Sequence, residues 1–291
     1  MANVTTDGAA ARYAEAVTRA SRTSFYYSFL LLPREKRRAI YAIYAFCRAA
    51  DDLADGPGDD ARKRRELEAW GEELRRCFDG RPTHPITAAL LPVIRRYSLP
   101  RERFEGILEG VTTDLTRKRY DTFEELRAYC YRVASLVGLL CVEIFGYRNP
   151  ASRSYAEELG LAFQMTNILR DLRADAEAGR IYLPREDLAR FHVSEADLLA
   201  GKLTPAFRDL MRFETERARE RFVSADRLLP VEDRRRLFAA RIMGEIYYGV
   251  LTEIERIGYD VFRRQASLSE VRKIGIALRI YLADRVFAAS H

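Results

Sequence analysis

Apolar residues recur along most of this chain at three- and four-residue spacings, with charged residues between them. This period is typical of amphipathic α-helices, and no pair of alternating strands with a hairpin turn interrupts it. Pro33, Pro100 and the pair Asp121 and Thr122 stand where helices commonly begin. The pattern therefore predicts an all-α fold. Helices are expected over residues 34–55, 60–78, 84–97, 101–117, 122–146, 151–177, 204–228, 231–264 and 268–288.

The chain shows no linker that would divide these helices into two groups. We expect one domain over residues 1–291, built as helices around a central cavity. Residues 1–10 are small and polar and are expected to be disordered. The charge-free apolar stretch 133–142 is shorter than the ~20 residues that span a bilayer, so it predicts a core helix.

Two matching aspartate clusters stand out in this helical pattern. Asp51 and Asp55 are four residues apart, and so are Asp171 and Asp175. Residues four apart share one helix face, where like charges repel by about 0.2–0.5 kcal/mol. Gly56 and Gly179 are expected to end these helices just beyond the pairs, where the helix dipole also disfavours negative charge. Carboxylates in such places indicate a bound cation, and magnesium fits because it takes one or two carboxylates and shares substrate phosphates.

The neighbours of each cluster strengthen this interpretation. Tyr44 and Arg48 precede the first pair at helical spacing, and Gln164 and Asn167 precede the second, beside Arg170. Buried polar groups without partners cost about 1–3 kcal/mol each, so these side chains need metal, water or ligand. One such acidic pair alone would most often be a solvated helix face. Two pairs, each with a nearby arginine and an apolar context, favour a functional site.

Composition limits the class of protein further. The formal net charge is +6 and the sequence pI is about 9.2, but basic residues are interleaved with acidic ones, which argues against a nucleic-acid groove. The four cysteines form no Cys-x-x-Cys pair, and the three histidines are scattered. A reducing cytoplasm fits this cysteine usage, and no secretory signal is evident.

Several segments together resemble the squalene/phytoene synthase family of head-to-head prenyltransferases, over about residues 21–248. The resemblance is carried by residues 24–27, 41–48, the first acidic cluster, 129–134 with 137–138, and 164–175 followed by 179–184. It implies an isoprenoid synthase fold in which two acidic helices face each other across the cavity. It also implies the magnesium-assisted ionisation of a prenyl diphosphate and coupling of the resulting carbocation to a second prenyl chain.

Within this family, residues 24–29 and 138–147 most resemble the enzymes that make presqualene diphosphate from two farnesyl diphosphates in bacterial hopanoid synthesis. Residues 50–55 instead resemble the sister enzyme that converts presqualene diphosphate to hydroxysqualene. Condensation of farnesyl diphosphate to presqualene diphosphate is therefore the expected reaction. The alternatives are a phytoene synthase that uses two geranylgeranyl diphosphates, a squalene synthase that also uses nicotinamide, and an inactive helical assembly factor.

The resemblance also assigns roles to individual residues. Asp51, Asp55, Asp171 and Asp175 would bind magnesium, with Asp52 and Asn167 as further ligands, and Tyr44 and Arg48 would act beside them in catalysis. Aromatic faces, among them Tyr26, would stabilise the carbocation. The residues expected to bind substrate are Ser24, Phe25, Phe29, Arg48, Tyr131, Val133, Gly138, Gln164, Asn167, Arg170 and Tyr182.

The C-terminal segment 271–287 has two interpretations. It is predicted to be a helix with an apolar stripe and basic residues beside the stripe. Such a helix either docks on the core or lies in an anionic lipid surface. Docking is the more common outcome, so we expect at most weak, salt-sensitive attachment at the inner face of a membrane. The stripe comprises Val271, Ile274, Leu278, Leu282 and Val286, and the basic residues are Arg272, Lys273, Arg279 and Arg285.

Overall fold

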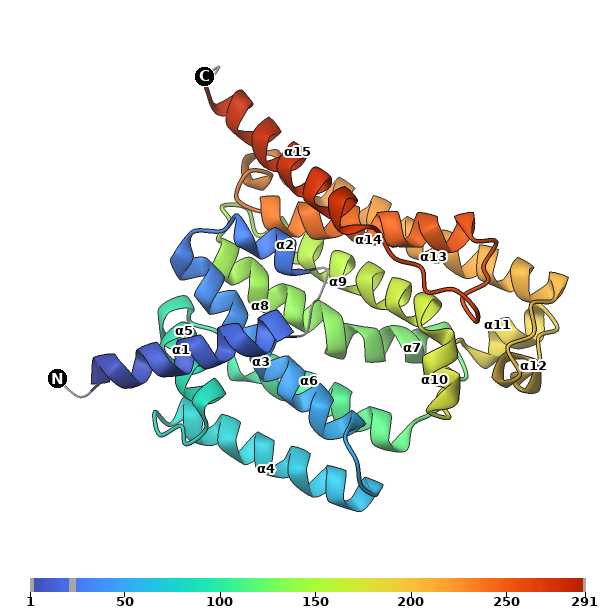
Figure 1. Ribbon diagram of the computed structural model, residues 1–291, viewed down its shortest axis with the longest axis horizontal. Coiled ribbons are helices and arrows are strands. Elements are labelled where there is room, and N and C mark those ends of the chain that lie inside the picture. The colour runs from blue at the N-terminus through green and yellow to red at the C-terminus, as the bar shows by residue number, and fades with distance from the viewer. Residues whose placement is uncertain (1–2, 21–24, 290–291) are drawn as a thin grey trace.

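The computed structural model describes residues 3–20 and 25–289, with side chains described over 9–18 and 28–284. The described chain is all-α, as predicted, and its one β-type contact is an isolated bridge between Arg119 and Ile181. Figure 1 shows the helices, which are α1 (Asn3–Ala20), α2 (Phe25–Leu30), α3 (Arg34–Asp55), α4 (Asp60–Phe78), α5 (Pro85–Tyr97), α6 (Arg101–Thr116), α7 (Phe123–Cys130), the π-helical η1 (Tyr131–Ser135), α8 (Leu136–Phe145), α9 (Ala151–Arg170), α10 (Leu172–Glu177), α11 (Arg185–Arg190), α12 (Glu195–Leu199), α13 (Pro205–Leu228), the 3-10 turn η2 (Val231–Asp233), α14 (Phe238–Arg256) and α15 (Glu270–Ala289).

Local sequence signals set several helix ends. Pro33 and Pro100 precede α3 and α6 as N-cap residues. The Thr122 hydroxyl accepts a hydrogen bond from the Glu125 amide, while the Glu125 carboxylate accepts one from the Asp121 amide. This reciprocal arrangement satisfies amides that have no partner inside α7. The predicted helix starts are therefore confirmed.

Other boundaries differ from those predicted. The expected helix 151–177 is divided at Asp171 into α9 and α10, and the expected helix 231–264 is reduced to η2 and α14. Helix α1 begins at Asn3, inside the stretch 1–10 that the sequence led us to expect to be disordered. Helices α11 and α12 were not predicted, because elements of six and five residues contain too few turns to show a period.

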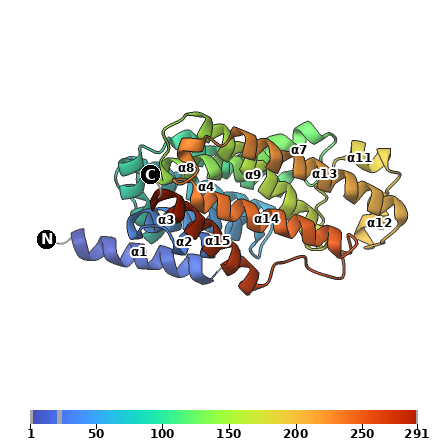
Figure 2. The same ribbon diagram turned by 90° about the horizontal axis from the view of Figure 1, so that it is seen from above.

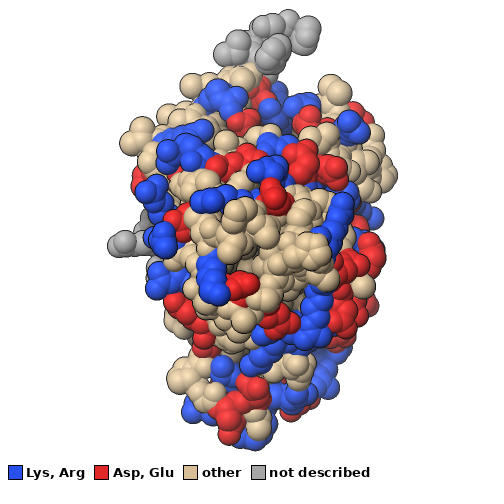
Figure 3. Space-filling view, turned by 90° about the vertical axis from the view of Figure 1, so that its right-hand side faces the viewer, with Lys and Arg blue, Asp and Glu red and all other residues tan. Residues whose placement is uncertain are grey.

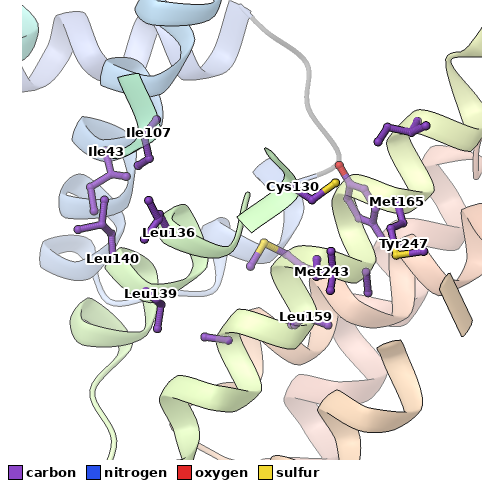
Figure 4. Close-up of a cluster of buried hydrophobic side chains, with 14 of the residues drawn as sticks. Ile43, Ile107, Cys130, Leu136, Leu139, Leu140, Leu159, Met165, Met243 and Tyr247 are labelled. Atoms are coloured by element: carbon purple, nitrogen blue, oxygen red, sulfur yellow. The ribbon is translucent and has the colours of Figure 1, made fainter. Parts of the chain in front are cut away.

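The core lies between α3, α6, α8, α9 and α14. Helix α9 packs against α8, α13 and α14, while α3 packs against α6 and α8. Figure 4 shows Ile43 and Ile107 beside Leu136 and Leu140, whereas Met243 and Tyr247 of α14 lie near α9. Charged side chains of both signs are interspersed on the face seen in Figure 3, around an uncharged area.

The helical stretch Phe123–Phe145 contains the π-turn η1 in its middle. By length and composition this stretch could cross a membrane, but half of its most apolar window is buried inside the fold. Close packing explains its small residues: a Cβ on Gly138 would come within 2.7 Å of the Ala156 carbonyl oxygen. Phe123–Phe145 is therefore placed as a core helix, and π-turns of this kind are frequent at functional sites.

Candidate active site

A cavity of about 230 Å³ lies in the middle of the bundle. One end is polar and includes Asp51, Gln164 and Asn167, whereas the rest is apolar. On α9 its lining extends from Asn167 back to Tyr155, which corresponds to about 18 Å from the helical rise of ~1.5 Å per residue. The cavity is therefore a slot with a polar end and a long apolar interior. It is lined by Phe29, Ile40, Ile43, Tyr44, Cys47, Asp51, Val133, Ala134, Val137, Gly138, Cys141, Val142, Phe145, Tyr155, Ala156, Leu159, Gly160, Phe163, Gln164, Asn167, Ala240 and Met243.

The first acidic cluster occupies the last turns of α3, which ends at Asp55 as predicted. Asp51 lines the cavity. Asp52 instead pairs with Arg48 at 2.6 Å, and both side chains are about half exposed. Asp52 also lines a separate surface pocket with Trp70. The structure thus directs Asp51 to the cavity and places Arg48 and Asp52 outside its lining.

The second acidic cluster lies where α9 passes into α10. Asp171 joins the two helices, and the Asp175 amide still donates to the Asp171 carbonyl oxygen at 3.0 Å. The helical spacing of the pair is therefore kept across the division. Arg170 donates to the Asp171 carboxylate at 2.8 Å. Gly179 follows with a φ of +74°, a left-handed conformation that suits glycine and ends the helix as predicted.

Asp114 of α6 is a further carboxylate, close enough for its charge to act on Asp51 and Asp175, and it had no predicted role. The hydroxyls of Tyr129 and Tyr182 donate to its two oxygens at 2.7 and 2.8 Å. The Tyr129 and Tyr182 rings are stacked with their centroids 5.3 Å apart. The Ile181 amide donates to the Lys118 carbonyl oxygen at 3.0 Å, which ties the segment after α10 to the segment after α6. That contact brings Tyr182 to Asp114.

The carboxylates of the two clusters influence one another. Asp51 remains open to the cavity, but the surrounding protein removes bulk water, and this burial raises its pKa to about 7 with help from the charges of Asp55 and Asp114. Burial likewise raises the pKa of Asp175 to about 7, and Asp171, Asp114 and Asp55 add to the effect. Such shifts mean that negative charge is crowded at the polar end of the cavity.

Arg180 partly compensates this charge. Its guanidinium donates to the Asp55 carboxylate at 3.1 and 3.2 Å, so a residue beyond α10 contacts the end of α3. The Arg180 Nε is buried without a hydrogen-bond partner among the described residues. Arg180 belongs to a segment that carries the family resemblance, but it had no predicted role. The sequence feature that could have identified Arg180 is its position directly after Gly179, where the second acidic helix ends.

The polar end fits a divalent cation. The side-chain oxygen of Asn167 is buried without a hydrogen-bond donor in the described part of the chain, although its amide nitrogen donates to Gln164 at 3.3 Å. Within the described residues, no three His, Cys, Asp or Glu side chains are arranged to hold one ion by themselves. Magnesium needs only one or two carboxylates when substrate phosphates and water complete its shell. The crowded carboxylates and the unpaired Asn167 oxygen match that requirement.

The other predicted site residues divide into three groups. Phe29, Tyr44, Val133, Gly138 and Gln164 line the cavity together with Asp51 and Asn167. Outside its lining are Arg48, Asp52, Asp55, Tyr131, Arg170, Asp171, Asp175 and Tyr182, of which Tyr182 binds Asp114. Ser24 lies outside the described residues, and so do the side chains of Phe25 and Tyr26.

Tyr247 of α14 is a third residue, after Asp114 and Arg180, that had no predicted role. Its ring lies 4.5 Å from that of Phe163, centroid to centroid. Burial raises the pKa of Tyr247, and hydrogen bonds with Arg170 and Asn167 act in the opposite direction. Tyr247 therefore links α14 to the second acidic cluster. It belongs to an apolar run of α14 in which nothing local distinguishes it from a core tyrosine.

An all-α bundle with paired aspartates at one end of a long apolar cavity defines a class of protein that binds a polyanionic head and an apolar tail. The sequence profile described as squalene/phytoene synthase matches residues 18–272. The chain belongs to this family, whose members are prenyltransferases that condense prenyl diphosphates head to head and use divalent metal for ionisation. The predicted family and isoprenoid synthase fold are confirmed.

The chain is similar to phytoene synthases in sequence, and to a squalene synthase and a dehydrosqualene synthase in structure. The chain is 40% identical over 267 residues to "Phytoene synthase" of Arthrospira platensis, covering 86% of this chain and 85% of that protein. It is 41% identical over 265 residues to "15-cis-phytoene synthase" of Synechococcus elongatus, with the same coverage. Among solved structures, the squalene synthase HpnC from Alicyclobacillus acidocaldarius has a TM-score of 0.76 and 34% identity, covering 86% of this chain and 95% of that one. A dehydrosqualene synthase has a TM-score of 0.84 and 29% identity, covering 99% of this chain and 100% of that one.

Proposed function

We propose that this protein is a phytoene synthase, which condenses two geranylgeranyl diphosphates head to head. The observation that carries the proposal is the identity of about 40% to proteins named phytoene synthase over most of both chains. This replaces farnesyl diphosphate as the expected substrate. The alternative weighed from the sequence is thus better supported than its first choice, presqualene diphosphate synthesis.

The length of the slot is compatible with the longer substrate. An extended prenyl chain advances about 1.3 Å per bond, from a single bond of ~1.5 Å, so a farnesyl tail extends about 14 Å and a geranylgeranyl tail about 19 Å. The cavity lining on α9 covers about 18 Å of helix. With its head at Asp51 and Asn167, a geranylgeranyl tail would extend along the whole slot to its end near Tyr155, whereas a farnesyl tail would stop short of that end.

The chain's own residues have distinct parts in the proposed reaction. Asp51, Asp55, Asp171 and Asp175 would hold magnesium ions, which supply Lewis-acid stabilisation of the departing diphosphate. The slot orients the allylic tail and keeps water from the carbocation, which water would otherwise convert to an alcohol. Tyr44 lines the slot near Asp51, where its ring can stabilise positive charge by about 0.5–2 kcal/mol.

The second candidate function is presqualene diphosphate synthesis from two farnesyl diphosphates. It is favoured by the resemblance of residues 24–29 and 138–147 and by the 34% identity to a solved squalene synthase. An inactive assembly factor is the third interpretation. It is less well supported because both pairs of aspartates are complete.

The deciding experiment is incubation of the purified protein with each prenyl diphosphate and magnesium, without nicotinamide, followed by product mass determination. We expect a forty-carbon hydrocarbon from geranylgeranyl diphosphate. A thirty-carbon diphosphate from farnesyl diphosphate, with geranylgeranyl diphosphate inert, would overturn the proposal in favour of the second candidate. Absence of any product from either substrate would support the inactive form.

A further inference from the structure

We infer that the outward face of α15 and the basic pocket beside it form a docking surface for an anionic lipid bilayer. Both lie away from the acidic end of the cavity, and neither takes part in the proposed condensation. In two perpendicular views α15 lies at the outside of the bundle (Figures 1 and 2).

The apolar stripe of α15 faces solvent rather than the core. Val271, Ile274, Leu278 and Leu282 are 81, 43, 47 and 56% exposed, and their spacing places them in one row along the helix. The row extends about 16 Å from the helical rise of ~1.5 Å per residue. The sequence had favoured a docked helix with this stripe inward, and that expectation is wrong for the four residues that the structure describes.

The opposite face of α15 already supplies its contact with the fold. Ala277, Ile280 and the stem of Lys273 are buried there. The Arg241 guanidinium donates to the Asp284 carboxylate at 2.7 Å, and this ion pair fixes the C-terminal half of α15 on α14. The helix is therefore anchored without the stripe. Large apolar side chains in a continuous exposed row mark an interaction surface.

A basic pocket of about 450 Å³ adjoins the same region. Lys36, Arg148, Arg235 and Arg236 line it, and Glu232 is the acidic residue in the lining. Phe238 also lines the pocket, and its ring lies 5.7 Å from that of Tyr281 on α15, centroid to centroid. The pocket and the stripe are thus joined by one aromatic contact.

The cations of the pocket are only partly compensated: Arg236 lies 3.9 Å from the Asp233 carboxylate, and the Lys36 ammonium donates to the Phe145 carbonyl oxygen. The side chains of Arg148 and Arg235 have no ion-pair partner among the side chains that the structure describes. Glu232 accepts a hydrogen bond from the Asn149 amide group, which occupies part of its carboxylate. Burial and the charge of Arg236 lower the pKa of Lys36, as expected where cations are crowded. Such a cluster favours a bound phosphate group.

The combination of the two features points to a lipid surface. A helix with exposed leucines, isoleucine and valine inserts at the acyl boundary, while nearby lysines and arginines bind anionic headgroups. A soluble phosphate would use the pocket but not the stripe, and a second protein copy would use the stripe but has no evident need of the unpaired arginines. Phe29 of α2 lines the cavity, and α2 packs against α15, so docking would bring the apolar end of the slot towards the bilayer.

Flotation of the full chain with vesicles, in the absence of prenyl diphosphate, tests the inference independently of the reaction. Vesicles of phosphatidylcholine mixed with phosphatidylglycerol should bind the protein at low salt, and vesicles of phosphatidylcholine alone should bind it less. The double variant Ile274→Gln with Leu278→Gln should bind the mixed vesicles about tenfold more weakly, since half-exposed apolar side chains lose their burial. Leu199→Gln, which alters an equally exposed leucine on α12, is the matched control.

The charge contribution is tested separately. Arg148→Gln with Arg235→Gln should reduce binding to mixed vesicles about tenfold and leave binding to phosphatidylcholine unchanged. The control is Arg64→Gln with Arg65→Gln, two exposed arginines on α4. Circular dichroism should show all variants folded, because every altered side chain is at least partly exposed.

Three results would overturn the inference. One is a lack of flotation with mixed vesicles at low salt. Another is the case in which vesicles do not bind the protein, but inorganic phosphate does and is no longer bound by the Arg148 and Arg235 variant. This result would assign the pocket to a soluble anion. The last is a change of oligomeric state in the Ile274 and Leu278 variant without vesicle binding, which would assign the stripe to a second copy of this chain.

Discussion

The apolar end of the slot should set the length of the prenyl tail, and Ala156→Leu tests this directly. Ala156 lines the cavity on α9, eleven residues before Asn167 at the polar end. From the helical rise of ~1.5 Å per residue, Ala156 is about 16 Å from Asn167, beyond the ~14 Å of a farnesyl tail and within the ~19 Å of a geranylgeranyl tail. Leucine adds three carbons at this position. The variant should therefore remove space that the end of a geranylgeranyl tail needs and a farnesyl tail does not.

The size of the effect follows from buried apolar groups. Burial of one methylene contributes ~0.8 kcal/mol, so excluding three tail carbons costs about 2 kcal/mol, or ~30-fold in kcat/KM for geranylgeranyl diphosphate. Farnesyl diphosphate should lose much less. The measurement is kcat/KM for both substrates, with Ala196→Leu, an exposed position on α12, as the control. A melting curve is needed beside it, because overpacking can cost about 1–3 kcal/mol of stability.

The same reasoning predicts the opposite change for Ile40→Ala. Ile40 also lines the cavity, eleven residues before Asp51 on α3, and its truncation enlarges the slot about 16 Å from that carboxylate. The ratio of kcat/KM for geranylgeranyl to farnesyl diphosphate should rise in Ile40→Ala and fall in Ala156→Leu. An unchanged ratio in both folded variants would refute the assignment of the tail to this cavity.

Three further outcomes are expected from the charged residues. Asp171→Asn should lower kcat about a hundredfold at limiting magnesium with little change in melting, because several kcal/mol of charge stabilisation depend on the cation; near-wild-type turnover would contradict its role. Arg180→Gln should melt about 2–4 °C lower than wild type without magnesium, because Asp55 loses its partner. Added magnesium should raise the melting temperature of this variant more than that of wild type, and equal increases would contradict the compensating role of Arg180. Burial raises the pKa of Glu214, although the charge of Arg217 opposes this shift. The contribution of Glu214 to stability is therefore greatest below the ordinary glutamate pKa of 4.5, and it is lost as pH rises through the folded-state pKa. The free energy of unfolding, measured with urea over a pH series, should fall with pH more steeply in wild type than in Glu214→Gln. The same pH dependence in both proteins would disprove the role of Glu214.

Features encoded locally were predictable from the sequence. The capping residues Thr122 and Glu125 identify the start of α7, and Gly179 identifies the end of the second acidic helix. Helical spacing also placed Gln164 and Asn167 with Asp171, and in the structure Gln164 and Asn167 line the polar end of the cavity while Asp171 ends the same helix. These inferences succeed because residues three or four apart are neighbours on any helix.

Contacts between distant segments were not predictable in this way. Asp114 meets Tyr182 across 68 residues, and Arg180 meets Asp55 across 125. A lone carboxylate on α6 has no local pattern that distinguishes it from a solvated one. Arg48 and Asp52 illustrate the converse, because their helical spacing suits the site but the structure pairs them with each other on the outer side.

The orientation of α15 was unpredictable for a related reason. A row of apolar residues at three- and four-residue spacing looks the same whether it faces a core or a solvent-exposed surface. Only the buried positions of Ala277 and Ile280 show which face is occupied. The period identifies a helix and its two faces, whereas the choice between them depends on α14.

Several aspartates lie close enough for their charges to interact, and the fold compensates this repulsion at more than one point. Asp114 receives two tyrosine hydroxyls, Asp55 receives the guanidinium of Arg180, and Asp171 receives that of Arg170. Asp51 and Asp175 have the raised pKa values, and a divalent cation near them would offset the repulsion that burial intensifies. The fixed cations and hydroxyls thus offset part of the charge of the two acidic helices. In the proposed reaction, the negative charge that remains would bind magnesium and, through it, the diphosphate of the substrate.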